Sequence, residues 1–329
     1  MTQEPQSINA IDTLTRLLAS APPKLSFEAS GMAFAPWRQA LAAKLRDISG
    51  LTRMEAWRCA LEPWEGEPED RGAYTRQRVT IQTTPDYRMP MWVLRPKGPG
   101  PFRPLIALHG HGGGMNDVAG VAPQPQDAER IKRINYAYAV QAVEHGYLVF
   151  APNKRGFGER LTGGQDCRAL AAAALSLGLS VIGMHTWDNQ RLLDYVATRP
   201  DARPGPASCI GVSGGGGGTL WLSAMDERIG AAVISGHLAA FDGKGLFGCV
   251  CNAAPGLLTW AERADIAGLI APRPLLIETG SHDDNYSRDR ALLALAALRR
   301  IYEAAGAADR LDADLFEGGH EWSGRKAWA

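Results

Sequence analysis

The chain has 329 residues, 35 acidic and 35 basic side chains, and a hydrophobic fraction of 45%. This length suits one large α/β domain or two average domains. Because the formal net charge is zero, no global field attracts nucleic acid or an anionic membrane, and we expect neither as a partner. The five cysteines show no CxxC or zinc-type spacing, which favours free thiols in a reducing compartment.

The beginning of the chain and its longest apolar stretch bear on localisation. The first ten residues, MTQEPQSINA, have neither the basic nor the apolar region of a signal peptide. The longest apolar stretch, residues 169–184, is interrupted by glycine and serine and is shorter than a membrane span. We therefore expect a cytoplasmic protein.

Helical periodicity without strands characterises the first 72 residues. The segments INAIDTLTRLLAS (8–20) and PWRQALAAKLRDI (36–48) space their apolar residues at three and four. We predict a helical N-terminal extension over residues 1–72. Its second helix is expected to dock on the rest of the chain; a lid, or a homo-oligomer formed through these helices, is the alternative.

Strands alternate with helices in residues 73–329, which we assign to one catalytic domain. Alternation of this kind predicts an α/β fold with a mostly parallel central sheet, here of about eight strands, flanked by helices. The predicted strands are 74–83, 88–96, 104–110, 146–153, 207–213, 229–235, 272–280 and 312–319, and the predicted helices are 128–145, 187–198, 217–225 and 289–305.

A serine followed by five glycines comes directly after the fifth predicted strand. Residues 211–215, GVSGG, fit the G-x-S-x-G pattern, in which the nucleophile lies on a sharp strand-to-helix turn. The glycines remove collisions where strand and helix cross, and the N–H of Gly214 is the expected oxyanion donor. Neither the dinucleotide nor the P-loop pattern fits these residues. The surplus glycines, 216–218, predict a close approach to neighbouring backbone, for example the turn at residues 112–114.

An acid and a histidine come after the last two predicted strands, in the order serine, acid, histidine that nucleophilic hydrolases of this fold use. His320 is the candidate base that takes the proton of Ser213. Two adjacent aspartates could hold its imidazole. We favour Asp283, three residues after Gly280, and keep Asp284 as the alternative.

The sequence HGHGGG, residues 109–114, comes after the third predicted strand. His109 and His111 alternate as metal ligands could, but no matching third ligand is evident, so we expect neither a metal nor a cofactor. The favoured interpretation is the second half of an oxyanion hole. Its donor is the backbone N–H of His111, with Gly112 as the alternative, and His109 is expected to pack and bond locally.

Four further side chains are candidates for substrate binding. Arg155 and Glu159 come after the fourth predicted strand, Trp187 begins a predicted helix, and Trp322 lies two residues after His320. The alternative is internal ion pairing and packing. Beside Trp187, Asp188 is expected to act as a negative charge at the N-terminus of its helix.

An ordered set of motifs resembles the α/β-hydrolase superfamily, in its dienelactone-hydrolase-like and acetyl-xylan-esterase-like branch. These motifs, spread over residues 74–322, include HGHGGG, APNKRGFGER, GVSGGGGGT, IAPRPLLIETGSHDD and EGGHEW. The resemblance implies a serine esterase acting on small-molecule carboxylic esters, sugar acetates among them. It assigns the acid to Asp283 and the second oxyanion donor to His111. An acyltransferase, a peptidase or amidase with the same residues, and a non-catalytic ligand-binding relative are the alternatives.

Overall fold

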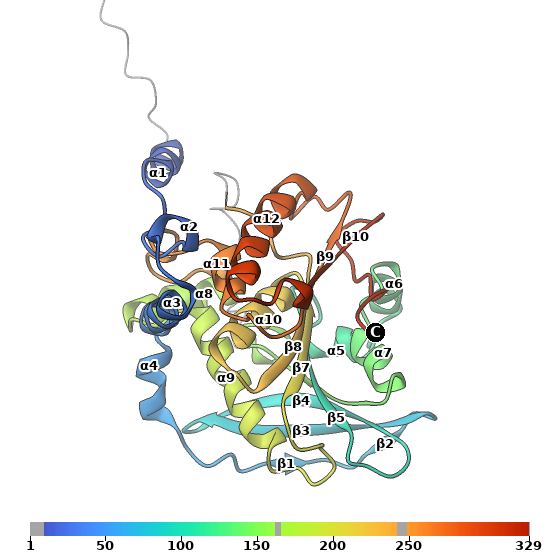
Figure 1. The fold of residues 1–329 in the computed structure, drawn as a ribbon. Coiled ribbons are helices and arrows are strands. Elements are labelled where there is room, and N and C mark those ends of the chain that lie inside the picture. Colours follow the sequence, from blue (N-terminus) through green and yellow to red (C-terminus); the bar gives the residue numbers. More distant parts are fainter. Residues whose placement is uncertain (1–9, 162–165, 242–248, 329) are drawn as a thin grey trace, which may run out of the picture.

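The structure is a computed structural model, and it describes residues 10–161, 166–241 and 249–328. Its centre is a ten-stranded sheet of order β1-β3-β4-β6-β5-β7-β8-β9-β10, with β2 paired to β3 (Figure 1). All eight predicted strands are confirmed: β3 Tyr74–Thr84, β4 Tyr87–Pro96, β5 Arg103–Leu108, β6 Tyr147–Pro152, β7 Ala207–Val212, β8 Ile229–Ser235, β9 Leu275–Gly280 and β10 Leu311–Phe316.

Neighbouring strands from β6 to β10 along the sheet are parallel. The other pairs, at the β1 end, are antiparallel. The carboxyl ends of β5, β7, β8, β9 and β10 therefore lie along one edge, where open parallel sheets place their binding sites.

Two short strands in the N-terminal segment were not predicted. They are β1, Trp64–Glu65, and β2, Glu69–Asp70, and both pair antiparallel with β3. Each is two residues long and exposed, so it has no room for an alternating pattern. The prediction of an N-terminal segment without strands is wrong for these residues.

Helices cover both faces of the sheet (Figure 1). One hydrophobic core joins the sheet to residues of α3, α9, α10, α11 and α12, and a second joins it to residues of α5, α6 and α7.

Among the described residues no single helix is long and apolar enough to cross a membrane. Only α8 and α9 taken together reach that length and hydropathy, and the chain bends by 96° between them. The helices are α1 Ala10–Ala19, α2 Phe27–Ser30, α3 Phe34–Ser49, α4 Leu51–Met54, α5 Met115–Val118, α6 Pro125–Arg133, α7 Tyr138–Glu144, α8 Cys167–Ser176, α9 Val181–Val196, α10 Gly214–Met225, α11 Arg263–Gly268 and α12 Arg288–Ala304.

Helix α3 docks on the rest of the chain, as expected. Trp37, Leu41 and Leu45 have no exposed surface and belong to the core that also contains α9–α12. The Trp37 indole N–H donates to the carbonyl of Leu25 at 2.9 Å, so its polar atom is satisfied. By contrast, α1 has no buried residue.

The helices predicted over 128–145 and 187–198 differ most from the structure, and the helix predicted over 217–225 begins earlier, at Gly214. The segment predicted as one helix over 128–145 forms α6 and α7, because the chain turns at Asn135, whose φ is +51°. The helix predicted to begin at Trp187 begins at Val181, where the Ser180 hydroxyl accepts the N–H of Gly183 at 3.0 Å. Trp187 and Asp188 therefore lie in the middle of α9.

Candidate active site

Ser213 occupies the turn between β7 and α10. Its backbone has φ 60° and ψ −123°, a region that costs a residue other than glycine about 1–3 kcal/mol. The Ser213 N–H donates to the carbonyl of Ser235, at the end of β8, at 2.9 Å. Ser213 is half-buried while its neighbours on both sides are buried, so this turn brings the serine to the edge of the core.

Glycines on both sides of Ser213 allow strand and helix to cross in contact. A Cβ added to Gly211 would lie 2.4 Å from the carbonyl carbon of Gly215. One added to Gly215 would lie 1.9 Å from the carbonyl oxygen of Leu108, in β5. Both distances are far below a van der Waals contact, so the predicted steric role of these two glycines is confirmed.

The surplus glycines face a different neighbour from the one predicted. A Cβ on Gly216 would lie 2.7 Å from the carbonyl oxygen of Ser235, and one on Gly217 would lie 2.8 Å from Cε1 of His237. The predicted close approach to backbone is therefore confirmed at Gly216, but its partner is the end of β8 and not the turn at 112–114. Gly217 and Gly218 meet side chains instead, those of His237 and Leu108. The sequence pattern does not contain the order of the strands, which places β8 beside β7.

We predict opposite outcomes for two alanine substitutions in α10. Gly215→Ala forces a methyl group into the Leu108 carbonyl, and we expect it to lower the free energy of unfolding by about 3 kcal/mol or more. In Gly218→Ala the added Cβ would meet side-chain atoms alone, Cδ1 of Leu108 at 3.1 Å and the end of Lys154 at 3.7 Å. Alanine is about 1 kcal/mol more favourable than glycine in a helix, and the close contact offsets this gain. We therefore expect little net change in the free energy of unfolding. Urea unfolding measures both, and equal destabilisation would contradict the role of the crossing contact.

Asp283 and His320 form a hydrogen-bonded pair after β9 and β10. Nδ1 of His320 lies 2.7 Å from Oδ2 of Asp283. The other oxygen of this buried carboxylate accepts the backbone N–H groups of Asn285 and Tyr286, each at 2.8 Å. Asp284 is exposed. Of the two aspartates, the structure thus brings Asp283 to the histidine.

The chain after β8 links this pair to the serine turn. A Cβ on Gly236 would lie 3.1 Å from Cε1 of His320 and 3.3 Å from Oδ2 of Asp283. Gly236 comes directly after Ser235, which accepts the Ser213 N–H. The serine and the Asp283–His320 pair therefore lie along one edge of the sheet, on either side of Ser235 and Gly236.

The glycine-rich turn after β5 lies against the start of α10. Nδ1 of His111 lies 3.4 Å from the position of a Cβ on Gly214. The turn is anchored at both ends: the Gly110 N–H donates to the Tyr136 hydroxyl at 2.7 Å, and the Gly113 N–H to Oδ2 of Asp117 at 2.7 Å. As the first residue of α10, Gly214 has an N–H without a partner inside the helix. The His111 ring and the Cα of Gly110 thus lie beside Gly214.

His109 bonds locally, as expected. Its buried ring donates from Nδ1 to the carbonyl of Gly110 at 2.7 Å, and its Nε2 accepts the N–H of Lys154 at 2.9 Å. Burial, together with the nearby Lys154 charge, lowers the pKa of His109 well below its usual value. A neutral ring with both nitrogens engaged in this way joins the ends of β5 and β6.

Arg155 is committed to an interior ion pair. Its guanidinium donates to both oxygens of Asp188 at 2.6 and 2.8 Å, and Arg160 donates to the same carboxylate at 2.9 Å. Burial alone would raise the pKa of Asp188, but the two guanidinium groups outweigh it and hold this pKa well below its usual range. Asp188 is therefore the centre of a buried charge network, and the prediction that it is a charge at a helix N-terminus is wrong.

The three remaining substrate candidates have other partners. Trp187 has no exposed surface, and its indole N–H donates to the carbonyl of Thr83 at 2.7 Å. Trp322 is 1% exposed, and its indole N–H donates to the Gln141 amide oxygen at 3.1 Å. Glu159 forms a half-exposed ion pair with Arg78. The structure therefore favours internal packing and ion pairing over substrate contact for these residues, as for Arg155.

We expect Asp188→Asn to destabilise the fold by about 3–5 kcal/mol, because it leaves two buried guanidinium groups without their anion. Asp47→Asn is the control, since Asp47 is 71% exposed in its pair with Lys44 and such pairs contribute little. Because the folded-state pKa is depressed, wild type keeps the Asp188 stabilisation at neutral pH. It loses that stabilisation as the pH falls below the ordinary value of 3.8. Denaturant unfolding at pH 7 measures the difference between the variants; equal losses would contradict this role.

An apolar cavity of about 260 Å³ opens between Tyr286 and the segment 252–259. Ala254, Leu257, Leu258 and Arg263 line it, with Tyr286. The Tyr286 ring stacks on His320, with 5.8 Å between ring centroids and 18° between planes. Sequence reasoning missed these residues, because they lie in loops and short helices that carry no motif.

Known proteins resemble the chain in sequence and in fold, although no protein-family model matches it. The "Putative hydrolase YtaP" of Bacillus subtilis (strain 168) is 28% identical over 251 residues, which are 73% of this chain and 81% of that protein. A putative acetyl xylan esterase from Bacteroides fragilis superposes with a TM-score of 0.78 at 19% identity, covering 94% of this chain and 83% of its own. A glucuronoyl esterase from Solibacter usitatus superposes with a TM-score of 0.64 at 15% identity, covering 92% of this chain and 93% of its own. The chain has the α/β-hydrolase fold.

Proposed function

We propose that the protein is a serine hydrolase of carboxylic esters, with Ser213, His320 and Asp283 as its catalytic residues. One observation carries this proposal: a strained, half-buried serine at a strand-to-helix turn shares a sheet edge with a hydrogen-bonded Asp283–His320 pair. The order serine, acid, histidine along the chain and the α/β-hydrolase fold support it. Two of the similar structures are described as esterases.

In the proposed first half-reaction, the Ser213 hydroxyl oxygen attacks the ester carbonyl carbon while Nε2 of His320 takes the hydroxyl proton. Asp283 accepts the Nδ1–H of the ring and stabilises the imidazolium that forms. The backbone N–H groups of Gly214 and His111, or Gly112 in place of His111, donate to the carbonyl oxygen as it becomes negative. Donors of this kind contribute about 2.7–4 kcal/mol each to transition-state stabilisation.

The tetrahedral intermediate then collapses. The carbon–oxygen bond to the alcohol breaks, and His320 returns its proton to that oxygen. In the second half-reaction water attacks the acyl carbon while His320 takes a proton from the water. The bond between that carbon and the Ser213 oxygen then breaks, His320 returns the proton to the serine oxygen, and the acid leaves. Asp283 keeps one imidazole orientation throughout, because its other oxygen is fixed by two backbone N–H groups.

The cavity beside Tyr286 is the proposed pocket for part of the ester. Its lining residues Ala254, Leu257 and Leu258 are apolar, and 260 Å³ lies near the lower end of small-ligand pockets. Small esters, acetyl esters of sugars among them, are therefore the proposed substrates. The names of the similar esterases agree with esters of carbohydrates.

The two adjacent aspartates provide a matched test of the proposed residues. We expect Ser213→Ala and His320→Asn to abolish hydrolysis of p-nitrophenyl esters, and Asp283→Asn to lower kcat by about 10³–10⁴ because the imidazole loses its orienting anion. Asp284→Asn, on an exposed neighbour, should leave kcat unchanged. Steady-state kinetics over a series from acetate to octanoate measures all four variants and the size of the acyl pocket.

An equal loss of kcat in Asp283→Asn and Asp284→Asn would contradict the assignment of Asp283 as the catalytic acid. Full activity of Ser213→Ala would remove the serine mechanism. If an added alcohol or amine were acylated in preference to water, the protein would be an acyltransferase that uses the same residues.

A further inference from the structure

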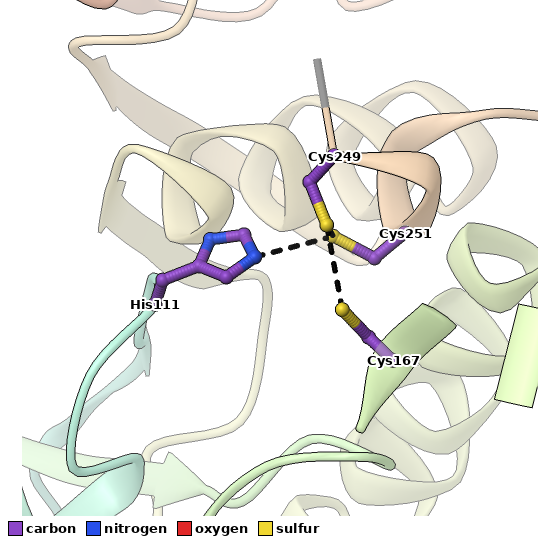
Figure 2. Close-up of side chains that lie close together, drawn as sticks. All are labelled: His111, Cys167, Cys249 and Cys251. Atoms are coloured by element: carbon purple, nitrogen blue, oxygen red, sulfur yellow. Dashed lines mark hydrogen bonds between the residues drawn. The ribbon is translucent and has the colours of Figure 1, made fainter. Parts of the chain in front are cut away.

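Three thiols and one imidazole meet beside the start of α10 (Figure 2). Cys167 is the first residue of α8, and His111 lies in the turn after β5. Cys251 lies in the short helix η4, Val250–Asn252, and Cys249 is the residue before that helix. The four candidate ligand atoms all lie within 4.8 Å of one another. Residues that are distant in the sequence thus place four soft or borderline donors around one point.

The separations of these atoms fit a tetrahedral metal ion. The Sγ atom of Cys249 lies 3.3 Å from that of Cys167 and 3.0 Å from that of Cys251, which lies 3.7 Å from Nε2 of His111. Around zinc, with Zn–S bonds near 2.3 Å and tetrahedral angles, neighbouring ligand atoms are about 3.7 Å apart. Small side-chain rotations, outward for the closer sulfurs, bring all four atoms to that spacing.

We propose that His111, Cys167, Cys249 and Cys251 bind one Zn²⁺ ion. Three thiolates and one imidazole form a ligand set typical of structural zinc sites, and four protein ligands leave no open position for water. Binding converts thiols to thiolates and releases their protons to solvent. Three thiolates and Zn²⁺ carry one net negative charge, and the buried side chain of Lys154, which donates to the carbonyl of Gly214 at 2.6 Å, lies nearby.

The position of this site gives the ion a structural role. It would tie the turn that holds His111 to α8 and to η4, and Cys249 and Asn252 also line the apolar cavity. These three segments are separate in the sequence, and the ion would hold them in one place. The zinc site does not depend on the proposed ester chemistry, although its ligand His111 carries one of the proposed oxyanion donors.

A disulfide is the competing arrangement for these thiols. It would join two of the sulfurs and leave the third cysteine and His111 without a shared partner. Zinc uses all four groups. No local pattern in the sequence marks this site, because the ligands come from three separate segments and the spacing Cys-x-Cys is not a zinc motif by itself.

Metal content and ligand chemistry, measured on the full chain, test the proposal. We expect wild type, expressed with added zinc and then desalted, to hold about one zinc ion per chain by elemental mass spectrometry. Replacement of zinc by Co²⁺ should give the intense visible bands of tetrahedral cobalt and a thiolate-to-cobalt charge-transfer band. Cys249→Ser and Cys251→Ser should lose the zinc, and Cys59→Ser, on a cysteine outside the cluster, should keep it.

If the variants fail to fold, the zinc content and the cobalt spectrum of wild type alone still test the proposal. A folded wild type with neither zinc nor a cobalt–thiolate spectrum would overturn it. So would zinc that survives in both cysteine variants but is lost in His320→Ala, since the ion would then sit on the Asp283–His320 pair. A disulfide between these cysteines, seen by alkylation and intact mass under reducing purification, would also overturn it. Ester hydrolysis is measured separately, so its absence leaves this result unaffected.

Discussion

Strand β7 and helix α10 cross in direct contact at Ser213, and the rest of the site depends on this close packing. The helix can begin directly after the strand only because Gly211 and Gly215 carry no side chain toward each other and toward Leu108. The cost of the positive φ at Ser213 is offset by the hydrogen bond from its N–H to Ser235 and by the core packed around α10. The same crossing leaves the first N–H groups of α10 facing the edge of the sheet.

The strand order then supplies the remaining groups. Because β5 and β8 both flank β7, the turn that carries His111 lies on one side of Ser213 and Gly236 on the other. Strands β9 and β10 continue the parallel order, so Asp283 and His320 arrive next to Gly236. Five neighbouring strands of one sheet therefore bring together residues that span more than half of the chain.

Much of this arrangement can be predicted from local sequence signals. Buried parallel strands appear as short apolar runs, and binding residues of such sheets lie just after the carboxyl ends of these runs, where Ser213, Asp283 and His320 occur. The mostly parallel α/β sheet predicted in this way is confirmed, as is the α/β-hydrolase fold that the family resemblance implies. The catalytic roles of the three residues stay predictions. The neighbour of Gly216 and Gly217 could not be assigned, since it depends on which strand lies beside β7.

Long-range partners account for the wrong prediction at Asp188 and for the packing that sequence spacing does not show. Asp188 has the local appearance of a helix N-terminal charge, but Arg155 and Arg160 reach it from a loop after β6. Likewise Trp187 and Trp322 become core residues only through packing that sequence spacing does not encode. The cluster of His111 with three cysteines is of the same kind, because three segments must fold before it exists.

Covalent labelling of the nucleophile tests the central claim most directly. Wild-type protein is treated with a fluorophosphonate, and the site of attachment is located by peptide mass spectrometry. We predict one phosphonyl group per chain, on Ser213, formed much more slowly when His320 is replaced by asparagine. Labelling of a different residue, or no labelling of a folded chain, would contradict the assignment of Ser213 as an activated nucleophile.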